Sequence, residues 1–368
     1  MKGNYVRFLL LAIVLTTALV TSAFAGWEVT YLHPAGQDSS VAYSVSGGQQ
    51  VGYTHLAGGA LWRAALWNGT AGSWTDLHPA GYSMSHAYGV SNGQQVGDAR
   101  IGIPYHAGLW TGTAESWVDL NPEGSIQSCA YGVSNGQQVG QAAIGDHYRA
   151  GFWNGTAASW VDLDPAGSRG SGAHATDGAQ QVGWAQTTGS FHACLWSGTA
   201  ASWVDLHPAG YELSEALGVS NGQQVGYVIT EYGLASLASL WSGTAASWVD
   251  LTPVGSPASF ANGVCNGRQV GGASFGGNTH AGLWTGTADT WEDLHGYLPA
   301  GYTSSRAQGI DMAGNDIWIA GYATNSATGA WEAVLWHNVI PEPSSLLALG
   351  AGLFGLAGIV RRRRISLP

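Results

Sequence analysis

The nine residues GVSNGQQVG occur three times without a change, at 89–97, 132–140 and 218–226. The glycine that ends this nonapeptide recurs in steps of 43 to 50 residues, at Gly52, Gly97, Gly140, Gly183, Gly226, Gly271 and Gly321. Asn-Gly between short alternating stretches is the strongest local signal for a two-residue type I′ hairpin, whose central residues both need a positive φ. Glycine adopts positive φ freely and asparagine tolerates it. The repeat therefore predicts the same tight β-turn in every structural unit.

Two further markers follow the same period. A Leu-Trp or Phe-Trp pair occurs seven times, at 66–67, 109–110, 152–153, 195–196, 240–241, 283–284 and 335–336. A W-x-D-L string occurs six times, beginning at Trp74, Trp117, Trp160, Trp203, Trp248 and Trp291. The stretch LWSGTAASWVDL predicts a second hairpin, with small polar residues between two tryptophan-bearing strands. Two hairpins per period give a four-stranded unit of about 43 residues, the size of a β-propeller blade.

The missing seventh W-x-D-L distinguishes an open array from a ring. The segment Trp27–Leu32 supplies a degenerate copy of that strand before the first nonapeptide, whereas the last unit stops at Trp336. The N-terminal strand should therefore complete the last blade. We predict an all-β, seven-bladed β-propeller of four-stranded blades. The alternative, a β-solenoid, would leave both ends unpaired and in need of polar caps.

The first 25 residues have the pattern of a secretory signal peptide. Lys2 and Arg7 give a positive start, residues 8–20 form an apolar run, and Ala23 and Ala25 form an A-x-A cleavage site before Gly26. This pattern is removed on export and is not part of the fold. The alternative, a buried or spanning N-terminal helix, is disfavoured because the run is short for a bilayer. The repeat domain is then 26–338.

The C-terminal segment 339–368 has three parts. A Pro-Glu-Pro turn (Pro341, Glu342, Pro343) precedes the apolar run 346–360, which is followed by Arg361, Arg362, Arg363 and Arg364. The run is short but usable as a membrane span, and the arginines would hold its end in the cytoplasm. The segment resembles the PEP-CTERM sorting signal of Gram-negative bacteria. The resemblance implies a transient inner-membrane anchor, export machinery and an exosortase-type enzyme that removes the tail during export to the cell surface or beyond.

The repeats themselves are similar to the HAF extracellular repeat. The strings HAGLW, at 106–110 and 280–284, and HACLW, at 192–196, resemble its His-Ala-Phe-Leu-Trp string, and the nonapeptide resembles its second string. This chain departs from the pattern at the phenylalanine, and the histidine is replaced in four units by Arg63, Arg149, Leu237 and Glu332. The resemblance implies export and a repeat architecture, but no activity.

Charge and cysteine content exclude several classes of protein. Between the two ends the chain has six arginines, no lysine and 22 of its 23 acidic residues. Such an acidic chain repels phosphate backbones, so no nucleic acid is expected as a partner. The three cysteines, Cys129, Cys194 and Cys265, are odd in number and occupy different positions in the repeat. They form no disulfide framework and are expected to be small buried residues.

The paired tryptophans allow two interpretations. Flat aromatic faces stack on sugar rings, but residues needed by every unit usually pack one blade against the next. We predict a structural core made of Trp67, Trp110, Trp153, Trp196, Trp241, Trp284 and Trp336.

The recurring aspartates and histidines predict neither catalysis nor a metal site. A catalytic carboxylate pair must lie about 5–9 Å apart, and metal ligands must converge, whereas equivalent positions of successive blades are separated. The aspartates, at positions 76, 119, 162, 205, 250 and 293, should face solvent or cap turns. His33, His78 and His207 precede proline in HPAG and should initiate turns. No cofactor is expected.

Variation among the repeats points to one end of the ring. The two hairpin turns are nearly fixed, whereas the connections between second and third strands, and between units, change in every repeat. In a four-stranded antiparallel blade these changing connections share one end, and loops on rigid scaffolds are where recognition usually resides. Unconstrained drift is the alternative. The candidate ligand-binding residues are Tyr82, Arg100, Tyr105, Asp146, His147, Tyr148, Tyr211, Glu212, Glu231 and Tyr232.

Three functions fit these features. The first is a non-enzymatic binding or scaffold protein of the cell surface or exopolysaccharide matrix, with a polysaccharide or surface protein as partner. The second is a carbohydrate-active enzyme on a propeller scaffold, an analogy at the level of fold only. The third is a purely structural surface component, which would self-associate and bind no ligand.

Overall fold

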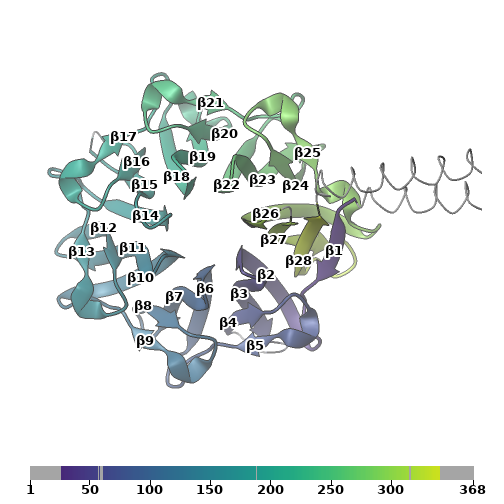
Figure 1. The fold of residues 1–368 in the computed structure, drawn as a ribbon, viewed down its shortest axis with the longest axis horizontal. Coiled ribbons are helices and arrows are strands. Elements are labelled where there is room, and N and C mark those ends of the chain that lie inside the picture. Colours follow the sequence, from purple (N-terminus) through teal and green to yellow (C-terminus); the bar gives the residue numbers. More distant parts are fainter. Residues whose placement is uncertain (1–25, 57, 59–60, 188, 315, 340–368) are drawn as a thin grey trace, which may run out of the picture.

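The computed structural model describes residues 26–339 apart from 57, 59–60, 188 and 315. In this part of the chain, seven four-stranded antiparallel sheets stand around a central axis as the blades of a propeller (Figure 1). The structure confirms the predicted fold and excludes the solenoid. The predicted signal peptide and sorting tail lie outside the described residues. Among the described residues, no helix is both long enough and apolar enough to cross a membrane.

Within each blade the four strands lie side by side from the central axis outward, and we call them a, b, c and d in that order. Blade 1 consists of β2 (Gln37–Ser46), β3 (Gln49–Leu56), β4 (Trp62–Trp67) and β5 (Thr75–Asp76). Blade 2 consists of β6 (Met84–Ser91), β7 (Gln94–Arg100), β8 (Tyr105–Trp110) and β9 (Val118–Asp119). Blade 3 consists of β10 (Ser125–Ser134), β11 (Gln137–Ile144), β12 (His147–Trp153) and β13 (Val161–Asp162). Blade 4 consists of β14 (Ser171–Thr176), β15 (Gln181–Ala185), β16 (His192–Trp196) and β17 (Val204–Asp205).

The remaining blades continue the pattern. Blade 5 consists of β18 (Leu213–Ser220), β19 (Gln223–Ile229), β20 (Ser236–Trp241) and β21 (Val249–Asp250). Blade 6 consists of β22 (Ser259–Cys265), β23 (Arg268–Phe275), β24 (Asn278–Trp284) and β25 (Glu292–Asp293). Blade 7 consists of β26 (Tyr302–Ala313), β27 (Asp316–Asn325), β28 (Trp331–Val339) and β1 (Glu28–Tyr31). The c–d turns of blades 1 to 6 contain 3-10 helices, namely η1 (Ala71–Ser73), η2 (Ala114–Ser116), η3 (Ala157–Ser159), η4 (Ala200–Ser202), η6 (Ala245–Ser247) and η7 (Ala288–Thr290). Two more lie in variable connections, η5 (Glu231–Gly233) and η8 (His295–Tyr297).

The ring closes as the missing W-x-D-L predicted. Strand β1 pairs antiparallel with β28, and Val29 lies opposite Trp336. The amide of Leu32 donates to the carbonyl of Ala333 at 2.8 Å, which extends the pairing beyond the strand. Figure 1 shows the purple N-terminal strand on the outside of the blade formed by the last three strands. The chain therefore joins head to tail within one sheet.

The Asn-Gly turn of the nonapeptide has the predicted backbone. Asn92 and Gly93 have φ values of 49° and 75°, and the turns in blades 3, 5 and 6 match them. Positive φ at both central residues is the signature of a type I′ turn, whose twist matches the flanking strands. Blade 1 uses two glycines at 47 and 48 instead.

The two outer glycines of the nonapeptide permit close backbone approaches. A Cβ added at Gly97 would lie 1.9 Å from the carbonyl oxygen of His86, because strand a bulges toward it. A Cβ added at Gly89 would lie 2.9 Å from the carbonyl oxygen of Tyr131 in the next blade. Real Cβ atoms do not approach oxygen this closely, so a larger residue would force strands apart at the narrow centre of the ring.

In the blades that contain the nonapeptide, its two glutamines fasten the blade to its own outer turn and to a neighbouring blade. The second, Gln95, accepts a hydrogen bond from the amide of Gly112 at 2.7 Å and donates to the carbonyl of Gly93. The same amide group donates to Gln49 of blade 1 at 3.2 Å. This side chain is completely buried, so its hydrogen bonds offset the cost of burying an amide. The glycines, the asparagine and the second glutamine of the nonapeptide thus each have a conformational, packing or hydrogen-bonding reason.

The core lies between blades. Trp153 of blade 3 packs on Val96, Ala107 and Leu109 of blade 2. The seven predicted core tryptophans are each 0 % exposed, namely Trp67, Trp110, Trp153, Trp196, Trp241, Trp284 and Trp336. Burying so large a side chain at every interface supplies much of the energy that holds the ring together.

Candidate functional site

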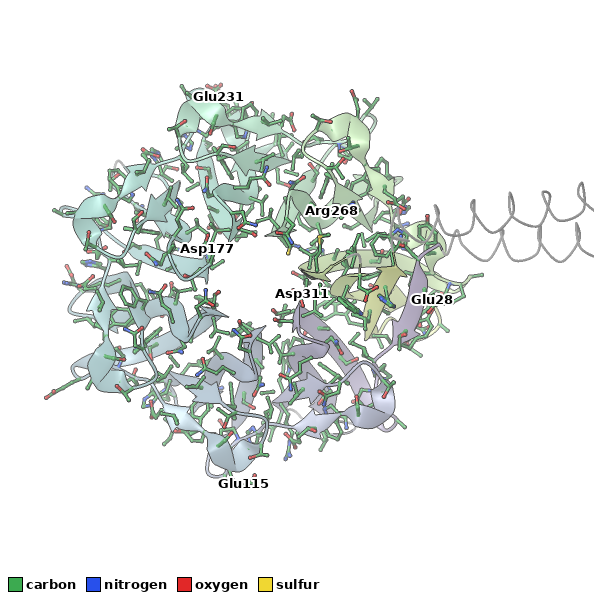
Figure 2. The ribbon with its side chains drawn as sticks, in the orientation of Figure 1. Glu28, Glu115, Asp177, Glu231, Arg268 and Asp311 are labelled. Atoms are coloured by element: carbon green, nitrogen blue, oxygen red, sulfur yellow. The ribbon has the colours of Figure 1, made fainter. Side chains whose placement is uncertain are left out.

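The two ends of the ring differ in chemistry. The a–b turns and, in blades 1 to 6, the c–d turns form one end and change little from blade to blade. The b–c and d–a connections form the other end, which we call the variable end. In blade 2 the b–c connection spans 101–104, and in blade 5 it spans 230–235 and contains η5. Figure 2 shows Glu231, from this connection, at the rim of the ring.

Two candidate residues meet at a cavity between blades 2 and 3. The cavity has a volume of about 140 Å³ and is lined by Asp98, Tyr105, Gln127, Ser128, Cys129, Tyr131, Gln141 and Tyr148. The candidates Tyr105 and Tyr148 lie at the start of strands β8 and β12, so the cavity lies at the variable end. The guanidinium carbon of Arg100 lies 5.9 Å from the ring centre of Tyr105, one of the lining residues. Gln127 donates a hydrogen bond to the hydroxyl of Tyr148.

Asp98 is the buried charge of this cavity. The residue is 6 % exposed, and its carboxylate accepts hydrogen bonds from His86 at 2.9 Å and from the Cys129 thiol at 3.2 Å. Burial, together with this nearby carboxylate, raises the pKa of the Cys129 thiol well above its ordinary value. The same two causes raise the pKa of Tyr88, which lies beside Asp98. The thiol therefore stays protonated and does not supply a nucleophile. The cavity offers hydrogen-bonding groups for a small polar ligand.

Two other candidates serve packing within the ring. The ring of Tyr82 lies 5.4 Å from that of Trp117, and the ring of Tyr211 lies 4.9 Å from that of Trp248. The Tyr82 hydroxyl also accepts a hydrogen bond from the Trp117 indole nitrogen at 3.0 Å. Each tyrosine comes from a d–a connection and covers the outer tryptophan of the next blade. Both are half-buried.

The remaining candidates are dispersed. His147 bonds to Asp146 at 2.8 Å and to Asp164 at 3.0 Å, within blade 3. The hydrogen bond to Asp164 is the main cause of the raised pKa of His147. Tyr232 is 86 % exposed at the tip of blade 5. Glu212 and Glu231 are exposed in connections of the same blade. The structure thus brings the candidates together in two groups, around blades 2–3 and on blade 5, and not in one site.

The inner strands carry a second variable set that comparison of the loops missed. Every strand a contains an alanine at the same repeat position, and the residue before it varies. Every strand b contains a glycine at the same repeat position, and the residue after it also varies. These two variable residues lie opposite each other in the pairing of strands a and b. The seven pairs are Val41–Tyr53, His86–Asp98, Cys129–Gln141, Gly172–Trp184, Glu215–Tyr227, Phe260–Gly272 and Arg306–Tyr322. The sequence signal that could have identified these pairs is a variable residue beside a fixed alanine and another beside a fixed glycine. Where one partner is glycine, the other is aromatic and covers it.

An aromatic arc lines one side of the axis. The bulged residue of strand a is aromatic in blades 1 to 4, and its rings lie 5.2 to 5.5 Å apart in the series Tyr43, Tyr88, Tyr131 and His174. Blades 5 to 7 place Leu217, Asn262 and Gln308 at this position. Burial raises the pKa of Tyr43 to about 12 and lowers the pKa of His174 to about 4. These two groups are therefore uncharged near neutral pH.

The recurring aspartates hold turns and pair with bases. Asp119 accepts a hydrogen bond from the amide of Asn121 at 2.8 Å, and all six aspartates cap their turns in this way. The second carboxylate oxygen of Asp119 accepts a hydrogen bond of 2.7 Å from His106, which lies thirteen residues earlier. Arg63, Arg149, His192 and His280 form the same pair in their blades. Blade 5 has Leu237 there, and Asp250 forms no ion pair within the described residues. This pairing was not predicted, although the spacing of thirteen is visible in the sequence.

The histidines of HPAG tie blades together. His78 bonds the hydroxyl of Ser85 at 2.8 Å and the carbonyl of Tyr82 at 3.0 Å. The Ser85 hydroxyl in turn accepts from the amide of Ala64 in the preceding blade. Across the part of the chain that the structure describes, no three histidine, cysteine or carboxylate side chains converge as metal ligands.

The fold is that of a seven-bladed propeller closed by its N-terminal strand. Comparison with known protein families identifies a sorting motif at the C-terminal end of the chain. Residues 339–364 match the PEP-CTERM protein-sorting motif. This motif indicates an exported protein with a C-terminal tail that an exosortase processes. The sequence has no significant match among curated proteins.

Solved structures share the fold at low sequence identity. The β-propeller domain of the Trilobed protease from Pyrococcus furiosus is 8% identical, with a TM-score of 0.53 over 84% of this chain and 98% of that one. YCF48 bound to D1 peptide is 12% identical, with a TM-score of 0.52 over 87% and 97%. A prolyl endopeptidase is 12% identical, with a TM-score of 0.53 over 84% of this chain. The match covers 51% of that enzyme, so this chain spans about half its length. These likenesses concern the fold alone.

Proposed function

We propose that the protein is a non-enzymatic binding or scaffold protein of the cell surface or exopolysaccharide matrix of a Gram-negative bacterium. Its tail would anchor it transiently in the inner membrane until an exosortase-type enzyme processes it. Its partner is a matrix polysaccharide or surface protein that contacts the variable end. The sorting motif at 339–364 supports the export step.

The distribution of exposed apolar side chains carries this proposal. Eleven large apolar side chains of the described residues are exposed at the variable end, namely Leu56, Leu61, Ile101, Ile103, Ile126, Phe191, Tyr232, Leu234, Val254, Tyr297 and Trp331. The other three, Val118, Val204 and Val249, lie on outer strands. None lies in the a–b and c–d turns that the structure describes.

Burial in a partner explains this asymmetry better than drift does. Ile103, Tyr232 and Leu234 are 81 to 86 % exposed. Exposed apolar groups that gather on one surface mark sites of interaction. Drift without function would favour polar residues in exported loops, as at the opposite end, where glycine, asparagine, serine and threonine predominate.

A binding experiment with a matched control tests the proposal. The purified protein is incubated with envelope and exopolysaccharide fractions of the producing cells, and the bound fraction is measured by sedimentation. We expect the double variant Tyr232→Ser, Leu234→Ser to bind at least tenfold more weakly. The control, Val204→Ser with Val249→Ser, removes two apolar side chains that are each 37 % exposed on outer strands and should bind normally.

Three outcomes would contradict the proposal. The first is no binding to any fraction, and the second is equal loss in both variants. The third is release of soluble sugars from the polysaccharide, which would favour a carbohydrate-active enzyme. Concentration-dependent self-association without binding would instead favour a purely structural component.

A further inference from the structure

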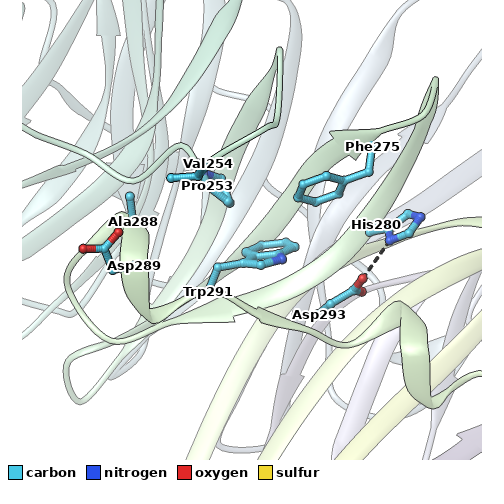
Figure 3. Close-up of a pocket in the computed structure, with 8 residues that line it drawn as sticks. All are labelled: Pro253, Val254, Phe275, His280, Ala288, Asp289, Trp291 and Asp293. Atoms are coloured by element: carbon cyan, nitrogen blue, oxygen red, sulfur yellow. Dashed lines mark hydrogen bonds and ion pairs between the residues drawn. The ribbon is translucent and has the colours of Figure 1, made fainter.

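A second cavity lies on the outer side of blade 6, and Val254 belongs both to its wall and to the exposed apolar residues of the variable end. Its volume is about 490 Å³, within the range of small-molecule sites. Figure 3 shows the Trp291 indole as its floor, with Phe275 on one side and Val254 of the incoming d–a connection above. Asp289 and Asp293 lie at its two ends.

Two sibling blades show what fills the equivalent space. In blades 2 and 5 a tyrosine from the incoming connection covers the outer tryptophan, as Tyr82 covers Trp117 and Tyr211 covers Trp248. Blade 6 has Ser256 at this position, six residues after the turn-capping aspartate as in the other two. The preceding glycine has nearly the same φ in all three, between 86° and 92°. The backbone path is conserved, and the ring is absent.

Other departures from the repeat converge on the same place. The HPAG alanine is replaced by Val254, which is 90 % exposed. The middle residue of the c–d turn is Asp289, where blades 3, 4 and 5 have alanine. Phe275 is the last residue of strand b, and its ring lies 6.1 Å from that of Trp291. Several substitutions that gather around one cavity indicate a site.

The edge of the tryptophan is available to a ligand. In blade 2 the indole nitrogen donates to the hydroxyl of Tyr82. Among the described residues, no group accepts from Trp291 Nε1, and that atom is not buried. Blades 3 and 4 also have serine at the tyrosine position, but Trp160 Nε1 is buried and Trp203 Nε1 donates to Cys194 at 2.8 Å. Blade 6 therefore combines an open cavity with a free donor.

We propose that this cavity binds a neutral pyranose ring. The sibling tyrosines, whose rings meet their indoles at interplanar angles of 67° and 55°, indicate that a hydroxyl-bearing ring fits against the indole. A sugar supplies several hydroxyls, and one can accept from Trp291 Nε1 while others donate to Asp289 and Asp293. Carboxylates accept several hydrogen bonds each, so the bond of 2.8 Å from His280 leaves Asp293 with capacity. Two carboxylates also repel an anionic sugar.

Binding is measured with methyl glycosides of known identity. The probes are the methyl glycosides of glucose, galactose, mannose and N-acetylglucosamine, with methyl glucuronide as the anionic counterpart and N-acetyltyrosinamide as the alternative ring. Saturation-transfer NMR on the full chain should detect at least one neutral glycoside with a dissociation constant on the order of 1 mM. The glucuronide should bind at least tenfold more weakly than its neutral counterpart.

Variants taken from the chain's own repeats locate the site. Ser256→Tyr restores the tyrosine of blades 2 and 5 and should weaken glycoside binding at least tenfold. Asp289→Ala restores the alanine of blades 3 to 5 and should weaken it severalfold while leaving the fold intact. Ser168→Tyr, at the equivalent position before blade 4, should leave binding unchanged.

The assignment would be overturned by any of three results. The first is that no neutral glycoside binds at about 50 mM. The second is that Ser256→Tyr and Asp289→Ala both bind glycosides as well as the unchanged protein does. The third is that N-acetyltyrosinamide binds while the glycosides do not. None of these results affects the proposal for the variable end, because its test changes Tyr232 and Leu234 of blade 5, which do not line this cavity.

Discussion

The backbone amide of Ala333 donates a hydrogen bond of 2.9 Å to the hydroxyl of Ser40, which lies 293 residues earlier in the chain. The same bond joins Ala64 to Ser85 and recurs between every other pair of neighbouring blades. The junction where the two ends of the repeat domain meet therefore has the same amide-to-serine hydrogen bond as the other six junctions.

Substitution of these serines tests that equivalence. Ser40→Ala leaves the buried amide of Ala333 without an acceptor, which should cost about 1–3 kcal/mol of unfolding free energy. Ser214→Ala breaks the same bond to Ala193, between blades 4 and 5, and should cost a similar amount. Urea unfolding measures both. A negligible cost at Ser40 beside a clear cost at Ser214 would mean that the ring is open at its ends.

Gly140 and Gly72 make a matched pair of glycines. A Cβ at Gly140 would lie 1.9 Å from the carbonyl oxygen of Cys129, so Gly140→Ala should destabilise the protein by at least ~3 kcal/mol. At Gly72 nothing lies within 4 Å, and three sibling turns have alanine there. Gly72→Ala should change stability by less than about 0.5 kcal/mol. Similar melting temperatures for the two variants would contradict the bulge.

Trp153 tests the packing between blades. Its indole is 0 % exposed between blades 2 and 3, so Trp153→Ala should cost on the order of 3–5 kcal/mol through lost burial and the cavity left behind. Trp160→Ala, on the partly buried outer tryptophan of the same blade, should cost less. Thermal unfolding compares the two. An unchanged melting temperature for Trp153→Ala would refute a structural role.

Three turn histidines predict acid sensitivity. Burial is the main cause that lowers the pKa of His78, His207 and His295 in the folded protein. The unfolded chain then binds more protons, so their stabilising contribution is complete above about pH 6.5 and is lost as the pH falls through the lowered values. Replacement of all three by asparagine should reduce this loss. Asn121 already fills the position in blade 3 and bonds Ser128 at 2.6 Å.

His147 supplies the opposite control. Its hydrogen bond to Asp164 raises its pKa, so its contribution is complete below about pH 6.5 and is lost as the pH rises through the raised value. His147→Asn should therefore steepen the loss of stability in acid. Urea midpoints at about pH 7.5 and pH 5 measure both effects. An equal slope in the triple variant and the unchanged protein would disprove the role of the turn histidines.

The fold could be predicted from the sequence because each repeat contains residues that determine its local backbone geometry. Asn92-Gly93 specified the turn by its need for positive φ, and the missing W-x-D-L specified where Trp27–Leu32 must pair. Both signals are local or are counts along the chain, so they need no knowledge of side-chain packing.

The site was less predictable because it depends on packing across blades. Tyr82 and Tyr148 both lie in variable stretches, yet one covers Trp117 and the other lines a cavity. The variable residues that pair across strands a and b, such as His86 and Asp98, could be identified only once the register of these strands was known. The repeat pattern identified the end of the ring that varies, but not which of its side chains face outward.

Hydrogen exchange of the whole protein, with and without the envelope fraction that binds it, tests the proposed function most directly. We predict protection on binding in the connections of the variable end, above all 101–104 and 230–235. The Asn-Gly turns at the other end should exchange as before. Protection confined to those turns, or spread equally over both ends, would contradict recognition by the variable end.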